Sequence, residues 1–189
     1  MTVSMTPSLR KLTLIAHITS SVGWLGAAIV VLALAITATT SQDVDIVRAA
    51  HLATQVIGWT VLIPLAFASL LTGLVQSLGT AWGLFRHHWV LLKLAMTVLA
   101  TVVLLLYTET LDYLAGIAAQ DTLSPTDLVM LRTPSVVLHT GAALVLLLTA
   151  ATLSVLKPQG MTRYGRRRQQ YEMTGSRPSR KVRSASPRQ

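Results

Sequence analysis

Four long apolar stretches, separated by short polar segments, dominate the chain. They cover about residues 12–38, 49–76, 88–108 and 135–156. About 20 consecutive apolar residues are enough to cross a bilayer as a helix. The pattern therefore predicts an all-α fold, a bundle of four antiparallel transmembrane helices. A leader, residues 1–11, precedes these helices, and a tail, residues 157–189, follows them.

The first apolar stretch carries a single polar stripe. Thr13, His17, Ser20 and Trp24 recur at helical spacing, so these four residues share one helix face. Inside a bilayer a polar face costs free energy unless it turns toward other helices. We therefore expect this face to point into the bundle.

Local signals refine the second stretch and its borders. Residues 39–47, which include Asp43 and Asp45, predict a short polar loop. Pro64, near the middle of the second stretch, removes one backbone hydrogen bond and predicts a kink. Residues 79–83 predict a tight glycine-rich connection to the third stretch.

The third loop has a structure of its own. The third helix is expected to continue beyond the membrane, because residues 111–118 keep a helical rhythm. Ser124 then suits a helix cap, Pro125 the first turn, and Asp127 the positive end of a helix. These residues predict a short extramembrane helix before the fourth span.

Composition supports a membrane protein with a basic tail. Charged residues make up only 12% of the chain, against roughly 25% in a soluble domain. The formal net charge is +9, but ten of the sixteen Lys and Arg residues follow Leu156. The charge therefore indicates a basic tail and no nucleic-acid partner. The absence of cysteine excludes disulfides and thiolate metal sites.

The distribution of charges predicts the orientation. Arg10, Lys11, Arg86 and the tail cations fall on one side, whereas Arg48 and Arg132 fall on the other with six of the seven acids. Because cytoplasmic flanks are rich in Lys and Arg, we expect both termini in the cytoplasm. The tail, poor in apolar residues, is expected to be disordered and to contact anionic lipids of the bilayer.

The candidate chemical groups are the five histidines of the chain and Lys93, a lysine inside the third span. By helical depth, His17, His87 and His88 belong to the cytoplasmic half, and His51 and His139 to the outer half. Histidines at the same depth can face each other across the diagonals of the bundle. The possible pairs are His17 with His87 or His88, and His51 with His139. Diagonal histidines can hold b-type haem in a four-helix membrane bundle. The candidate cofactor-binding residues are thus His17, His51, His87, His88, Lys93 and His139, with His17 and His139 as candidate metal ligands.

Each of these residues also has a structural explanation. A histidine at the membrane interface needs no special role, and His17 and His139 are equally expected as hydrogen-bonded structural residues. Lys93 either extends to the cytoplasmic headgroups or pairs with an anionic group, such as a porphyrin propionate or a lipid phosphate. Trp24 and Trp59 lie deep enough in their spans to pack in the core.

Three sequence motifs resemble known membrane proteins. The pattern His17-x6-Trp24-x-Gly26 resembles a group of small bacterial proteins that includes CopD-type copper-resistance proteins and HemJ-type protoporphyrinogen oxidases. Residues 71–87 and 157–165 look like an uncharacterised family of bacterial four-helix integral membrane proteins, and this likeness covers about residues 9–168.

The resemblances imply two cofactors. A HemJ-like protein implies haem b on His17, with Trp89 and Lys93 on a later span. A CopD-like protein implies copper passage, but copper(I) prefers sulfur ligands, and Met96 is the only methionine within a span. Copper import is therefore disfavoured.

Three classes of function remain compatible with the sequence. The first is a redox or porphyrin-handling protein with b-type haem. The second is a non-catalytic membrane subunit or scaffold with structural histidines, whose partners are a second copy or other membrane subunits. The third, and the least favoured, is a small-solute permease. The chain contains no G-x-S-x-G, H-E-x-x-H, P-loop or dinucleotide motif, so no enzymatic reaction is assigned. A bacterial plasma membrane is the expected location.

Overall fold

The computed structural model describes residues 5–79, 88–156, 160, 162, 166 and 167, and within them every regular element is helical. In order these are α1 (Pro7–Thr40), α2 (Val44–Ile57), the π-helical turn η1 (Gly58–Leu62), α3 (Ile63–Gly79), α4 (His88–Ala118), α5 (Pro125–Leu131) and α6 (Ser135–Leu156). The predicted all-α fold is confirmed. The glycine-rich connection is described only at Gly79, and the tail only at residues 160, 162, 166 and 167; their other residues, like His87, lie outside the described part.

Four helical segments are long and apolar enough to cross a membrane. They are Pro7–Thr40, Val44–Gly79, His88–Ala118 and Pro125–Leu156. The second combines α2, η1 and α3, and the fourth combines α5 with α6. These segments correspond to the four predicted spans and indicate a multi-pass membrane protein.

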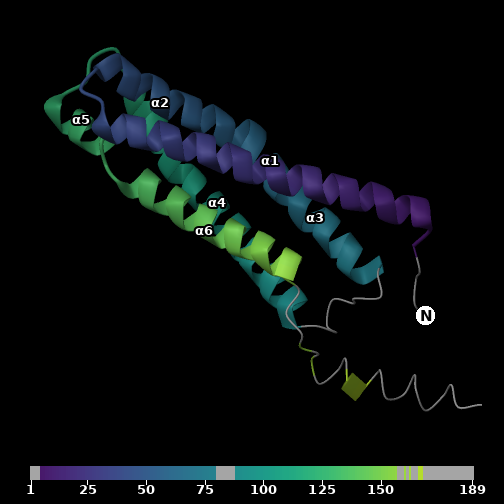
Figure 1. Ribbon diagram of the computed structural model, residues 1–189. Coiled ribbons are helices and arrows are strands. Elements are labelled where there is room, and N and C mark those ends of the chain that lie inside the picture. Colours follow the sequence, from purple (N-terminus) through teal and green to yellow (C-terminus); the bar gives the residue numbers. More distant parts are fainter. Residues whose placement is uncertain (1–4, 80–87, 157–159, 161, 163–165, 168–189) are drawn as a thin grey trace, which may run out of the picture.

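The helices pack side by side (Figure 1). α1 packs against α2, α3 and α6, and α4 packs against the same three helices. α1 ends and α2 begins at the end of the molecule that carries α5, which we call the α5 end (Figure 1). α1 begins, α3 ends, α4 begins and α6 ends at the opposite end, which we call the His88 end (Figure 1).

The first loop is shorter than predicted. The side chain of Asp43 caps α2 by accepting bonds from the backbone N–H groups of Asp45 and Ile46. Because this cap starts the helix at Val44, and α1 continues to Thr40, only residues 41–43 form the loop, in place of the predicted 39–47. α1 also begins earlier than expected, at Pro7, which follows the cap residue Thr6.

A π-helical turn, η1, precedes Pro64 in the second span. The proline ring lacks an N–H group and would clash with the carbonyl four residues back in a regular α-helix. In η1 the N–H of Ile63 bonds to the carbonyl of Gly58, five residues back. This wider turn accommodates the proline and changes the direction of the side chains that follow Ile57.

The segments around the third loop follow the sequence signals. α4 continues to Ala118, beyond the predicted end of the span. The hydroxyl of Ser124 accepts a bond from the N–H of Asp127, and the Asp127 carboxylate accepts one from the N–H of Ser124. This capping box confirms the predicted start of α5 at Pro125. α6 has the predicted bounds, Ser135–Leu156.

Two apolar clusters form the core. The cluster toward the α5 end contains Ala35, Val47, Leu111, Leu114, Ile117, Ala118, Leu131 and Val136. The second contains Trp24, Ala28, Val31, Leu62, Ala66, Ala100 and Leu144. Trp24 is buried as expected, but the prediction that Trp59 packs in the core is wrong, because this residue is 50% exposed. It belongs to η1, and its indole donates to the half-buried carboxylate of Asp112.

In α1, α3 and α4, the described turns nearest the His88 end contain no buried residue. Among the described residues, the first buried side chain of α1 is Ser20, the last of α3 is Ser69, and the first of α4 is Ala100. The helix turns nearest the His88 end therefore pack less tightly than the rest of the molecule.

Candidate functional site

His17 lies at the interface between α1 and α3. Its Nδ1 is 3.1 Å from the carbonyl oxygen of Ser69 and 3.2 Å from the hydroxyl of Thr72. A carbonyl oxygen only accepts, so Nδ1 carries the proton in the bond to Ser69. The other ring nitrogen, Nε2, is then unprotonated in the neutral ring and has a lone pair for a ligand.

Small and polar residues surround the His17 ring. A Cβ added to Gly73 would lie 3.0 Å from Cε1 of His17, so a larger residue would require the ring to shift by a few tenths of an ångström. The hydroxyls of Ser21 and Ser69 are 2.7 Å apart and link α1 to α3 beside it. The Ser20 hydroxyl donates to the carbonyl of His17 at 3.1 Å. The polar stripe of α1 therefore faces inward at His17 and Ser20, as predicted.

Lys93 and Gln76 extend this polar region toward the His88 end. Lys93, half-buried on α4, lies within electrostatic range of His17. Gln76 lies one turn beyond Thr72 on α3, and its Nε2 is buried without a hydrogen-bond partner among the described residues. The region thus combines a ring nitrogen, an ammonium group and an amide donor on three helices.

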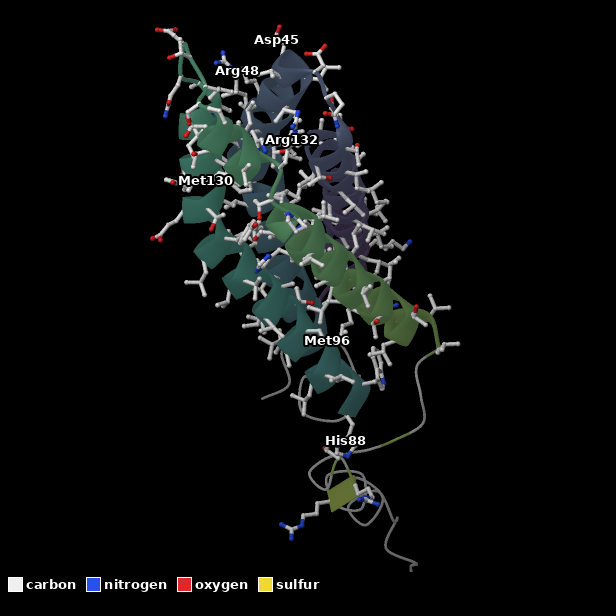
Figure 2. All side chains as sticks on the ribbon, turned by 90° about the vertical axis from the view of Figure 1, so that its left-hand side faces the viewer. Asp45, Arg48, His88, Met96, Met130 and Arg132 are labelled. Atoms are coloured by element: carbon white, nitrogen blue, oxygen red, sulfur yellow. The ribbon has the colours of Figure 1, made fainter. Side chains whose placement is uncertain are left out.

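The structure places the remaining histidine of the His88 end apart from this region. His88 is exposed at the start of α4, and its backbone N–H donates to the carbonyl of Gly160 at 3.4 Å. Figure 2 shows His88 at the tip of the helix, beyond Met96. The hydrogen bonds of His17 and of His88 do not join the two residues, and His87 lies outside the described residues.

His51 connects α2 to α5. Its Nε2 is 2.7 Å from the carbonyl oxygen of Leu131, and the residue is only 4% exposed. Leu131 is the last residue of α5, where carbonyl groups have no partner within the helix. His51 therefore satisfies a helix end that is buried, which is a structural task.

His139 is bound within its own helix. Its Nδ1 is 2.9 Å from the carbonyl of Ser135, and its ring stacks on Tyr107 with centroids 4.2 Å apart. The Tyr107 and Ser135 hydroxyls are 2.8 Å apart. The ring is exposed, with Nε2 outside this contact.

The two candidate metal ligands lie far apart along the molecule. Ala35 and Val136 belong to one core cluster, so these residues mark a common level of α1 and α6. His17 lies eighteen residues before Ala35, which corresponds to roughly 27 Å of α-helix. His139 lies only one turn beyond Val136, so it cannot share an iron atom with His17. The described residues contain no cluster of three His, Asp or Glu side chains suited to a metal ion.

Sequence reasoning missed one polar cluster at the α5 end. The Asp112 Oδ1 accepts a bond from Gln55 at 2.8 Å and one from the Trp59 indole at 3.0 Å. Gln55 and Trp59 were visible as polar positions following His51, but their partner on α4 was not. A contact across 53 or more positions leaves no local signal in the sequence.

Two arginines at the same end bond only to loop carbonyls among the described residues. Arg48 donates to the carbonyls of Gln120 and Asp121, at 2.5 and 3.2 Å, and Arg132 donates to that of Gln42 at 3.4 Å. Figure 2 shows both arginines at the α5 end, opposite His88. They join the α1–α2 loop and the segment after α4 to neighbouring helices.

No protein family, curated protein or solved structure matches this chain. The candidate site therefore rests on its own geometry and on the sequence motifs described above.

Proposed function

We propose that the protein is an antiparallel four-span bundle in a bacterial plasma membrane, with both termini in the cytoplasm. The four apolar segments and the excess of Lys and Arg near the His88 end support this orientation. In this arrangement α5 and its polar loops face the outside, and His17 and Lys93 belong to the cytoplasmic half. The tail contacts anionic lipids of the same leaflet.

The orientation predicts the labelling of single cysteines. The natural chain contains none, so Ser8→Cys and Thr122→Cys each introduce one reactive thiol at an exposed position. We expect a membrane-impermeant maleimide to label Thr122→Cys in intact cells, and Ser8→Cys only after lysis. The opposite pattern would reject the orientation while leaving the helical fold unaffected.

Within this bundle we propose a site for b-type haem or a related porphyrin at His17, in a redox role. The observation that carries it is the bond between Nδ1 of His17 and the Ser69 carbonyl. A ligating histidine ordinarily gives its second ring N–H to a carbonyl or carboxylate, which fixes the tautomer and aims the other nitrogen at the metal. The resemblance of the His17 motif to HemJ-type proteins supports the same site.

The surrounding residues fit such a group. Gly73 leaves space that a Cβ would fill beside the ring. When bound, haem would supply a one-electron iron couple. The chain's own contribution is to orient the imidazole through Ser69 and Thr72 and to exclude water.

The alternative is a non-catalytic membrane subunit with structural histidines. The observation that favours it is the hydrogen bonding of His51 and His139, because both rings bond to backbone carbonyls. We therefore place neither residue in the proposed haem site. A second copy of the chain or another membrane protein would be the partner in this alternative.

An absorption spectrum tests the proposed haem site. Protein purified in detergent from a haem-replete host should show a sharp α-band in the dithionite-reduced minus oxidised spectrum. His17→Ala should abolish this band by removing the ligand. His139→Ala should retain it, because this residue lies roughly 20 Å or more away along the helices.

Two outcomes would contradict the proposed site. A flat wild-type spectrum after haem supplementation would favour the membrane subunit. Loss of the band in His139→Ala, with the band of His17→Ala unaffected, would indicate that the residue that binds haem lies at the α5 end. Gel filtration of each variant separates loss of haem from loss of folding.

A further inference from the structure

Among the described residues, Lys93 has no acidic partner in its half of the molecule. The acids of the described residues are Asp43, Asp45, Glu109, Asp112, Asp121 and Asp127, and all lie in or near the loops of the α5 end. Glu109, the nearest acid along α4, follows Lys93 by sixteen residues, or roughly 24 Å of helix. The half-buried side chain of Lys93, on an apolar helix, therefore favours an anion from outside the described residues.

Gln76 adds an independent observation. Its Nε2 is buried and has no acceptor among the described residues. Buried amide donors are nearly always hydrogen-bonded, so this group indicates a missing acceptor. Gln76 lies on α3 one turn from Thr72, the residue that contacts His17, and Lys93 lies within electrostatic range of the same histidine. Both donors therefore lie toward the His88 end of the packed helices α3 and α4.

The depth and surroundings of this region indicate the class of ligand. Lys93 follows the start of α4 by five residues, or roughly 8 Å, close to the boundary between headgroups and hydrocarbon. The same turns of α3 and α4 carry exposed apolar side chains, namely Leu71, Val75, Leu78 and Leu92. No side chain is buried this close to the His88 end in the described parts of α1, α3 and α4. A ligand with an oxyanion head and apolar chains matches the depth of Lys93, the exposed apolar side chains and the lack of buried residues.

We propose that Lys93 and Gln76 bind the phosphate of one anionic phospholipid from the leaflet at the His88 end. Lys93 contributes the charge, and the Gln76 side chain turns its amide out of the helix interface to donate a hydrogen bond to a phosphate oxygen. The acyl chains lie against the apolar side chains of α3 and α4. The site is separate from the basic tail and does not require haem at His17.

Native mass spectrometry tests this lipid site. Protein reconstituted with equal amounts of phosphatidylglycerol and phosphatidylcholine, then extracted in mild detergent at high salt, should retain one phosphatidylglycerol. High salt removes lipid held only by exposed tail cations. Lys93→Met and Gln76→Leu should each lower the retained fraction at least tenfold, and Lys93→Arg should restore it. Lys11→Met, the matched loss of an exposed cation on α1, should leave retention unchanged.

The same measurement separates this site from the haem site. His17→Ala should lose the haem band and keep the lipid, so the two proposals fail independently. Equal retention of both lipids, or equal retention in Lys93→Met and Lys11→Met, would overturn the lipid site and leave Lys93 as a contact to bulk headgroups. Release of a porphyrin in place of a lipid, lost in Lys93→Met, would overturn it too and assign the anion to the porphyrin.

Discussion

His51→Ala is expected to lower the free energy of unfolding by about 3 kcal/mol. The substitution removes a bond of 2.7 Å and leaves the Leu131 carbonyl without its partner. An orphaned buried acceptor costs about 1–3 kcal/mol, and the lost ring leaves a cavity beside a residue that is fully buried. Unfolding in mixed detergent and SDS, followed by circular dichroism, measures the change.

His139→Ala is the matched control for this prediction. It makes the same substitution in a helix of the same membrane protein, but its ring is exposed and its Nδ1 bonds to a carbonyl of its own helix. We expect a cost of about 1 kcal/mol, mainly from the stacking on Tyr107. Equal losses in the two variants would contradict the role assigned to His51 in holding α5.

Gly73→Ala is expected to differ from Gly26→Ala by about 2 kcal/mol in unfolding free energy. Both substitutions favour the helix by removing a glycine. A Cβ on Gly73 would lie 3.0 Å from the His17 ring, whereas one on Gly26 would meet nothing within 4 Å. Gly26→Ala should therefore stabilise the protein slightly, and Gly73→Ala should destabilise it by displacing the ring from Ser69.

A double-mutant cycle with His17→Ala identifies the cause. If the His17 ring is what Gly73 accommodates, Gly73→Ala should lose most of its cost once the ring is removed. A cost that stays the same in the His17→Ala background would place the clash elsewhere, on the α1 or α3 backbone. The cycle uses stability alone and so does not depend on a bound cofactor.

The helices could be predicted from the sequence because their causes are local. Apolar length determined the four spans, and the Ser124 and Asp127 pair determined where α5 begins. The loop after α1 was predicted too long because the Asp43 cap was read as part of a polar loop. A cap and a loop use the same residue types, so their difference appears only in the backbone geometry.

The contacts of the candidate site were decided by tertiary structure. Helical spacing alone indicated that His17 faces inward, but its partner Ser69 lies 52 positions away. Which residues meet depends on the relative rotation and depth of α1 and α3. Trp59 follows Gly58, a buried position of η1, and its indole meets Asp112 outside the two core clusters. Apolar periodicity determines which face is buried, whereas the registers of the helices determine which polar groups make contact.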